Sequence, residues 1–139
     1  MEKIEHIGIA VQALTESMPR FEALLQTPCY KTETVEEQGV TTAFFQVGQS
    51  KIELLEATRP DSPIAKFLQK RGEGIHHIAF AVSDIKAQMK TLEAAGFQLL
   101  SQEPQQGADG KWVCFLHPKQ THGVLIELCQ DRPTTDHST

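Results

Sequence analysis

Two histidines and two glutamates recur at matching positions of a chain that carries the same pattern twice. The segment "EHIGIAV" aligns with "HHIAFAV" 71 residues later, which pairs His6 with His77. The segment "KIELLE" aligns with "LIELCQ" 74 residues later, which pairs Glu53 with Glu127. Two imidazoles and two carboxylates suit a divalent first-row metal such as Co, Ni, Mn or Zn, and leave room for substrate oxygens in a six-coordinate site. These four residues therefore predict a metal site.

Alternation along the strands separates these candidates from the bulky side chains, because neighbours on a strand point to opposite faces. In both histidine segments, His6 or His77 shares its face with glycine or alanine, and the larger apolar residues share the other face. The bulky face must pack under a helix, so the small residues leave space beside the imidazole rings. His76 and its repeat partner Glu5 fall on the bulky face, and we expect neither to take part in the site.

The repetition favours a site over four ordinary polar residues. A histidine that opens a strand, or a glutamate that alternates with leucines, is usually just a polar group on a solvated face. Here both types recur at equivalent positions. On a concave face, each unpaired polar side chain would cost roughly 1 to 3 kcal/mol, and more if charged. A divalent cation removes that cost.

The rest of the repeat supplies the elements that must hold these residues. The segments "ALTESMPRFEALL" and "DIKAQMKTLEAAG" keep the offset of 71 and space their apolar residues by three and four, which predicts an amphipathic helix in each half. Two further strands are expected in each half, at 30–36 and 41–47 in the first and at 97–101 and 111–117 in the second. The stretch "QEPQQGADG" is expected to be a loop.

Each half thus has the order strand, helix, strand, strand, strand, within a single domain of 139 residues. Between the halves, Asp61 or Ser62 caps a short helix that begins near Pro63. The expected parts are module 1 (3–57), a linker helix region (58–73), module 2 (74–130) and a loose polar tail (131–139).

Composition narrows the class of partner. The net charge is −5, and the 13 basic residues never cluster, which argues against nucleic acid and against an anionic membrane surface. No run approaches the ~18 apolar residues of a membrane span, and the amino end lacks the features of a signal peptide, so a cytoplasmic protein is expected. Cys29, Cys114 and Cys129 form no CxxC motif and are expected to be small buried apolar residues. A small molecule is the expected partner.

Several motifs together resemble one family. The stretches "HIGIAV", "EEQGV", "KIELLE", "DSPIAKFL", "GEGIHHIAFAV", "FLHPK" and "GVLIEL" are similar to those of the methylmalonyl-CoA epimerases, within the vicinal oxygen chelate (glyoxalase-like) superfamily. The likeness spans roughly residues 3–130. It implies an α+β fold in which two tandem βαβββ modules form a cupped, metal-centred cleft, and it implies a homodimer.

The resemblance also implies a reaction. The family removes and returns the proton on the carbon between a thioester carbonyl and a carboxylate, and so interconverts (2R)- and (2S)-methylmalonyl-CoA. Glu127 matches a glutamate that is both a metal ligand and a proposed base. Where the family pattern has a second glutamate, this chain has Thr42, whose hydroxyl is no base at neutral pH. The second acid/base is then a water on the metal, another carboxylate such as Glu36 or Glu37, or absent.

Other charged residues are candidates for binding the coenzyme, or lie in turns. Lys111, Lys119 and Arg71 are candidates for the phosphates of coenzyme A, although the chain has no glycine-rich phosphate loop. His117 and His122 flank the turn "HPKQTHG" and are expected in a loop.

Three other functions are considered. A glyoxalase I would use the same four-ligand pattern on a glutathione hemithioacetal, but its last turn is "DPDG"-like, whereas this chain has "HPKQTHG". An extradiol dioxygenase would hold iron(II) with two histidines and one carboxylate, and the fourth candidate, Glu53, argues against it. A metal-free binding module of the drug-sequestering kind lines its cleft with aromatic residues, and this chain has one Trp and one Tyr.

Overall fold

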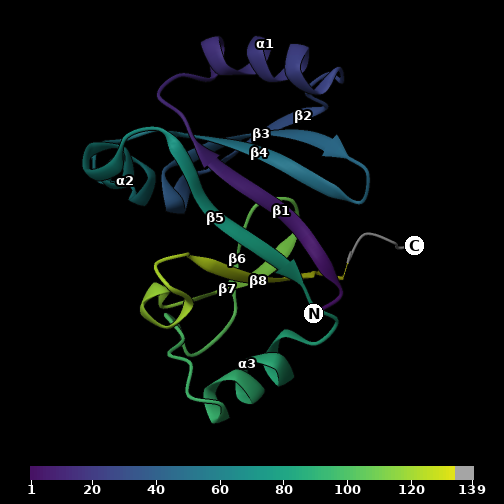
Figure 1. Cartoon of the computed structure of the whole chain (residues 1–139), viewed down its shortest axis with the longest axis vertical. Helices are drawn as coiled ribbons and strands as arrows, with labels where there is room; N and C mark the ends of the chain where they lie inside the picture. Colours follow the sequence, from purple (N-terminus) through teal and green to yellow (C-terminus); the bar gives the residue numbers. More distant parts are fainter. Residues whose placement is uncertain (134–139) are drawn as a thin grey trace.

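Eight strands pair edge to edge in one curled sheet in the computed structural model, which describes residues 1–133 (Figure 1). The strands are β1 (Lys3–Ala10), β2 (Lys31–Val35), β3 (Val40–Val47), β4 (Ser50–Ala57), β5 (Gly74–Ala81), β6 (Gln105–Gln106), β7 (Lys111–Leu116) and β8 (Ile126–Asp131). Their order across the sheet is β2-β3-β4-β1-β5-β8-β7-β6.

The two halves of the chain build the sheet in the same way. In each half the first strand lies parallel to the last one, β1 beside β4 and β5 beside β8. The halves then join along the antiparallel pair of β1 and β5. The four central strands are therefore β4, β1, β5 and β8, and these carry Glu53, His6, His77 and Glu127, respectively.

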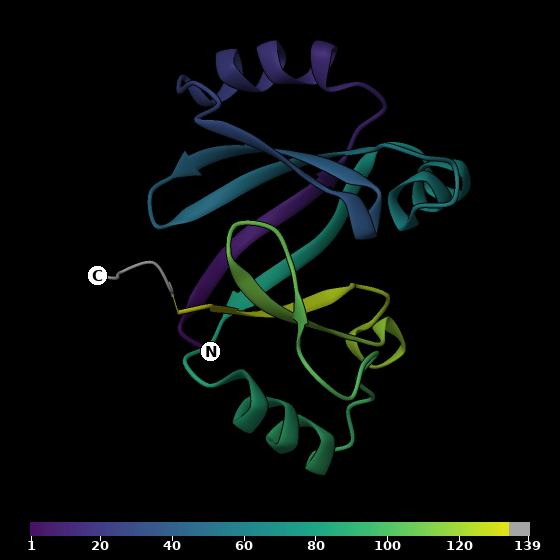
Figure 2. The ribbon, with the colours of Figure 1, turned by 180° about the vertical axis from the view of Figure 1, so that it is seen from behind.

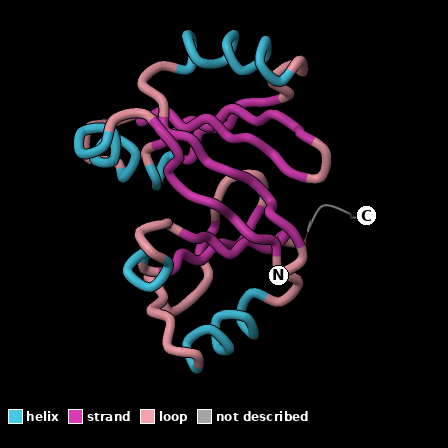
Figure 3. Tube along the Cα trace, in the orientation of Figure 1, coloured by secondary structure: helices cyan, strands magenta, loops and turns pink. Residues whose placement is uncertain are grey.

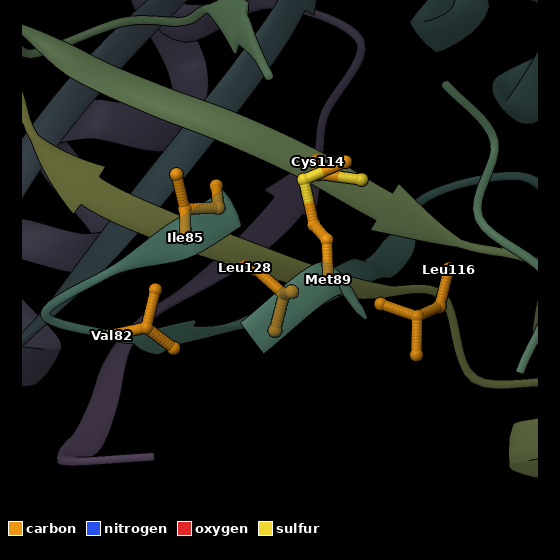
Figure 4. Close-up of a cluster of buried hydrophobic side chains, with 6 residues drawn as sticks. All are labelled: Val82, Ile85, Met89, Cys114, Leu116 and Leu128. Carbon is orange, nitrogen blue, oxygen red and sulfur yellow. The ribbon is translucent and has the colours of Figure 1, made fainter. Parts of the chain in front are cut away.

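One long helix covers the outer side of each half, as Figure 3 shows at opposite ends of the molecule. These helices are α1 (Leu14–Leu25) and α3 (Ile85–Ala94). Each buries an apolar stripe on the strands of its own half, because strand faces and helix stripes must be covered together. Figure 4 shows the core under α3, formed by Val82, Ile85, Met89, Cys114, Leu116 and Leu128. Within residues 1–133, no helix has the length and hydropathy to cross a membrane.

The helix between the halves is α2 (Pro63–Arg71), and it settles the choice of cap. The Ser62 hydroxyl accepts a hydrogen bond from the N–H of Ala65 at 3.1 Å, and Pro63 opens the helix. Asp61 instead accepts a hydrogen bond from Arg59 at 2.8 Å. The apolar face of α2 packs on β1 and β4, which closes one side of the sheet near the four central strands.

The expected strand at 97–101 is wrong. Only Leu99 pairs there, as an isolated bridge to Leu116. The sixth strand lies instead at Gln105–Gln106, inside the stretch expected to be a loop. Phe97 and Leu99 pack against the core under α3. The backbone of this run pairs only briefly, since Leu100 donates to Phe115 and His117 donates to Gln98, each at 2.8 Å.

The expected loose tail begins later than residue 131. Asp131 is the last residue of β8 and lies opposite Lys111 of β7. The N–H of Arg132 donates to the carbonyl of Gly110 at 2.8 Å. Both residues thus belong to the paired edge, and residues 134–139 of the expected tail lie outside the described part of the chain.

Candidate metal and acid/base site

Three of the four candidate ligands meet at one centre. Nε2 of His6 lies 3.0 Å from Nε2 of His77. Oε1 of Glu127 lies 2.9 Å from Nε2 of His77 and 3.4 Å from Nε2 of His6. All three side chains are buried, and their ligand atoms lie within 4.8 Å of one another, close enough to hold one metal ion. The structure thus brings together residues from both halves of the chain.

Glu53 is buried beside this centre, but it faces another edge of His6. Its Oε2 lies 3.2 Å from Nδ1 of His6, on the other ring nitrogen from the one that approaches Glu127. Glu53 is 4% exposed. It is therefore next to the three-residue cluster without being one of the three that share a centre.

Small residues make room for the two histidines. Across the β1–β5 pair, His6 lies opposite Ala79, and His77 lies opposite Gly8. A Cβ atom on Gly8 would lie 2.3 Å from Cε1 of His77, closer than a side chain and a ring can approach. Gly8 also pairs with Glu53 on the neighbouring strand. The small residues expected beside each imidazole are thus those of the opposite half.

The expectation that Glu5 and His76 point away from the site is wrong. The pairing of β1 with β5 shifts register between Ile4 and His6 and again between Gly8 and Ile9, which skips Glu5 on β1 and His76 on β5. Such a bulge breaks the alternation and re-aims side chains. Glu5 is consequently 4% exposed beside His6, and His76 lines the cavity described below.

Periodicity alone does not reveal a bulge, so alternation was bound to misplace both side chains. The available signal was the repeat itself, since Glu5 and His76 are polar residues at equivalent positions, each directly before a candidate ligand.

The buried carboxylates attract positive charge. Burial lowers the pKa of His6, but its hydrogen bonds to Glu127 and Glu5 outweigh burial and raise that pKa to about 10. Burial opposes ionisation of Glu127, yet its hydrogen bonds with the two histidines bring its pKa down to about 2. Burial, with the negative charge of Glu127, raises the pKa of Glu53 to about 7. A cluster that holds an extra proton so firmly also suits a cation.

Glu5 lies in a network of charges around His6. Its Oε1 lies 2.5 Å from Nδ1 of His6, and its Oε2 accepts a hydrogen bond from Nζ of Lys51 at 2.6 Å. Burial alone would raise the pKa of Glu5, but the hydrogen bonds with His6 and Lys51 outweigh burial and hold that pKa well below its usual range. Nζ of Lys111 lies 3.5 Å from the same carboxylate and also contacts Asp131. Glu5 is thus an ionised carboxylate with fixed partners.

Beside the cluster lies a cavity of about 360 Å³, at the small end of the range of ligand pockets. Its polar walls are formed by the two histidines and two glutamates of the site together with Gln38, Thr42, His76, Gln105 and Lys111. Its other walls are mostly apolar and include Val40, Leu55, Ile64, Val113, Phe115 and Leu125. The cavity can thus hold a small acid against the cluster, with apolar contacts around it.

Of the other residues proposed as acid/base groups or as coenzyme contacts, some line this cavity and some do not. Thr42 is 1% exposed and lines it, as does Lys111. Glu36 and Glu37 do not line it, although the next residue, Gln38, does. Arg71 and Lys119 are also absent from its walls.

The remaining histidines and the cysteines lie as expected, with one difference. His117 and His122 flank the 3₁₀ turn Pro118–Thr121, and neither lines the cavity. Cys114 and Cys129 are buried, whereas Cys29 is only partly so.

A loop from the second half closes over the cavity and is fastened to the first half. It joins β6 to β7 and crosses in front of the sheet (Figure 2). The Asp109 carboxylate accepts hydrogen bonds from Nζ of Lys31 at 2.5 Å and from Nζ of Lys51 at 2.6 Å. The N–H of Asp109 donates to Glu33 at 2.9 Å. Gly107 and Ala108 of this loop line the cavity, so the clasp helps to set the cavity's width.

Known proteins are similar to this chain in both sequence and fold. A sequence model of the glyoxalase/bleomycin resistance protein/dioxygenase superfamily matches residues 5–115. The chain is 41% identical over 130 residues to an ethylmalonyl-CoA/methylmalonyl-CoA epimerase of Cereibacter sphaeroides, covering 92% of this chain and 97% of that protein. It is 40% identical over 129 residues to the mitochondrial methylmalonyl-CoA epimerase of Homo sapiens, covering 92% of this chain and 73% of that protein.

A solved structure is similar over nearly the whole chain. A variant of the Streptomyces coelicolor methylmalonyl-CoA epimerase, in complex with 2-nitronate-propionyl-CoA, superposes with a TM-score of 0.91 at 40% identity. The match covers 96% of this chain and 99% of that one.

Proposed function

The chain belongs to the methylmalonyl-CoA epimerases of the glyoxalase/bleomycin resistance protein/dioxygenase superfamily, and from this membership we propose that it interconverts (2R)- and (2S)-methylmalonyl-CoA. The observation that carries the proposal is a buried, ionised carboxylate, Glu127, that shares a small cavity with two histidines. The reaction needs a base in such a place, because the proton to be moved lies on carbon and is only weakly acidic.

Glu127 is the base in this proposal. Its carboxylate holds no proton at neutral pH, because the two histidines keep its pKa at about 2. The mostly apolar walls of the cavity limit the water around this carboxylate, which strengthens its electrostatic interaction with a bound substrate. A positioned base of this kind contributes about 10²- to 10⁴-fold to the rate.

His6, His77 and Glu127 are the proposed ligands of a divalent metal, with Glu53 as the fourth. The donor set fits, since two imidazoles and carboxylates suit Co, Ni, Mn or Zn, and the buried cluster draws positive charge. A cation there would supply Lewis-acid stabilisation of the negative charge that develops on the thioester oxygen.

Inversion needs a second acid/base, and the cavity narrows the choice. Glu36 and Glu37 lie outside its walls, and the Thr42 hydroxyl is no base. The titratable side chains that remain along the walls are His6, Glu53, His76, His77, Lys111 and Glu127. The proposed second group is therefore one of these other than Glu127, or a water bound among them.

The coenzyme A part of the substrate is proposed to lie outside the cavity. The cavity suits the malonyl end of the substrate, and the coenzyme extends from its mouth. Nζ of Lys111 already contacts Asp131 and lies near Glu5. Arg71 and Lys119 thus stay as the proposed phosphate contacts. A homodimer and a cytoplasmic location are also proposed, and light scattering on the purified protein tests the former.

Deuterium exchange tests the function. The purified, Co²⁺-reconstituted protein is incubated with methylmalonyl-CoA in deuterated water, and the α-proton is followed by mass spectrometry. We expect the substrate to gain one deuterium at C2 with turnover. If the α-proton stays unexchanged while the methylglyoxal–glutathione adduct is turned over, the protein is a glyoxalase and the proposal is wrong.

A further inference from the structure

The residues that precede the two cluster histidines make matching contacts with them. Oε1 of Glu5 lies 2.5 Å from Nδ1 of His6. Nδ1 of His76 lies 3.0 Å from Nδ1 of His77. In both cases the preceding residue contacts Nδ1, and Nε2 of the histidine is left facing the centre where Glu127 lies. At His6, Glu5 is the nearer of two carboxylates at Nδ1, since Oε2 of Glu53 lies 3.2 Å from the same nitrogen.

A shared backbone irregularity creates both contacts. Glu5 and His76 are the residues that the β1–β5 pairing skips, and they occupy equivalent positions of the repeat. Without these bulges, neighbours on a strand would point to opposite faces, and neither side chain would reach the ring of its neighbour. The same device therefore appears once in each half.

We propose that Glu5 and His76 are positioning residues, which hold the imidazoles of His6 and His77 with Nε2 directed at the metal. The inference rests on the proposed metal site. A histidine that binds a metal through one nitrogen carries a proton on the other, and a partner for that proton fixes both the tautomer and the ring orientation. Glu5 and His76 are those partners.

Each positioning residue is itself held in place. Lys51 donates to the second oxygen of Glu5 at 2.6 Å and reaches the Asp109 carboxylate with the same ammonium group. The ring of His76 packs edge-on against Phe67 of α2, with ring centroids 5.0 Å apart.

Glu5 could instead be a metal ligand itself, at a separate site, but the surrounding contacts argue against this. Glu5, His6 and Cys129 also lie close enough together to hold an ion. The thiol of Cys129, however, donates to the carbonyl of Phe80 at 3.5 Å, and burial raises its pKa, which disfavours the thiolate that a metal needs. Glu5 therefore acts on His6 and is not part of a separate site.

The test measures metal affinity. Apo protein is titrated with Co²⁺ against a competing chelator, and the histidine tautomers are read from ¹⁵N NMR. Glu5→Ala and His76→Phe remove the contacts at Nδ1, and His76→Phe keeps a ring against Phe67. Glu5→Gln and His76→Gln keep a polar atom there. Glu56→Gln is the matched control, since Glu56 accepts a hydrogen bond from the N–H of Leu14 at 2.6 Å and does not touch the histidines.

We expect Glu5→Ala and His76→Phe to weaken Co²⁺ binding by about 10- to 100-fold, with a mixture of tautomers at the affected histidine. The two Gln variants should fall between these and the wild type, and Glu56→Gln should bind as the wild type does. Wild-type affinity in Glu5→Ala and His76→Phe would overturn the inference, as would an equal loss in Glu56→Gln. If Glu5→Ala does not fold, the Co²⁺ affinity of Glu5→Gln tests whether Glu5 positions His6. A wild-type protein that binds no Co²⁺ contradicts the proposed metal site instead.

Discussion

Gly8 lies opposite His77 on the neighbouring strand, so close that a Cβ atom at Gly8 would lie 2.3 Å from Cε1 of the imidazole. The glycine is thus required by the ring beside it and not by its own backbone conformation. Because His77 is also 2.9 Å from Glu127, any atom added at Gly8 must displace a ring that is held on both sides.

Gly8→Ala should therefore weaken metal binding as well as stability. We expect the added methyl group to cost about 1 to 3 kcal/mol of unfolding free energy, because it overpacks a buried site. Urea denaturation measures this cost, and the Co²⁺ titration measures the displaced ring. Gly48→Ala is the control, since Gly48 has φ 60° and nothing within 4 Å of a Cβ. It should lose stability through backbone strain and keep its Co²⁺ affinity.

Glu127→Gln should reduce the α-proton exchange by about 10²- to 10⁴-fold, because an amide cannot take the proton. The deuterium exchange assay measures this at saturating Co²⁺, so that weaker metal binding does not mask the result. Glu37→Gln, which lies outside the cavity walls, should exchange at the wild-type rate. Substantial exchange by Glu127→Gln would place the base elsewhere.

Thr42→Val should retain exchange to within about tenfold, even though Thr42 lines the cavity and is 1% exposed. A threonine hydroxyl gives up no proton at neutral pH, so its loss removes no acid/base step, whereas a true acid/base would be worth about 10²- to 10⁴-fold. The valine keeps the shape of the side chain. A loss of a hundredfold or more, with normal Co²⁺ affinity, would assign Thr42 a direct part in the proton transfer.

Asp109→Asn should weaken the clasp between the halves, with an effect that depends on pH. Burial alone would raise the pKa of Asp109, but the hydrogen bonds from Lys31 and Lys51 outweigh burial and lower that pKa below its ordinary value. Its stabilisation is thus fully present above the unfolded pKa of about 4 and is lost as pH falls through the lower folded value. At pH 7 we expect a loss of about 1 to 2 kcal/mol.

Urea denaturation of both proteins between pH 7 and pH 3 checks this, and the difference should shrink below about pH 4. Asp61→Asn is the control, because Asp61 pairs with Arg59 at an exposed position and should cost less than about 1 kcal/mol at any pH. A constant difference for Asp109→Asn across the range would show that its charge is not what matters.

Much of the arrangement follows from periodicity and from the repeat. The spacing of apolar residues predicts both long helices, and the offset of 71 pairs His6 with His77. Alternation correctly put small residues on the face of those histidines. These features were predictable because they depend on local pattern and on regular strand geometry.

The features that the sequence did not predict depend on breaks in regular strand geometry or on contacts between residues far apart in the chain. The bulges that turn Glu5 and His76 inward leave no trace in the alternation, since a bulge inserts a residue without changing the composition of the strand. The apolar run near Leu99 predicts a full strand, because nothing in its sequence shows that the backbone pairs only around Leu99 before it turns away. The clasp at Asp109 joins residues 58 and 78 positions apart, and nothing local to Asp109 indicates either partner.

The centre draws one histidine from β1 of the first half, and a histidine and a glutamate from β5 and β8 of the second. A cation bound there would tie the two halves across their shared strand pair, so its binding energy would add to the free energy of unfolding by mass action. At a free metal concentration of 100 times the Kd, that amounts to about 2.7 kcal/mol. The melting temperature of this protein would then report the metal supply around it, even when no substrate is present.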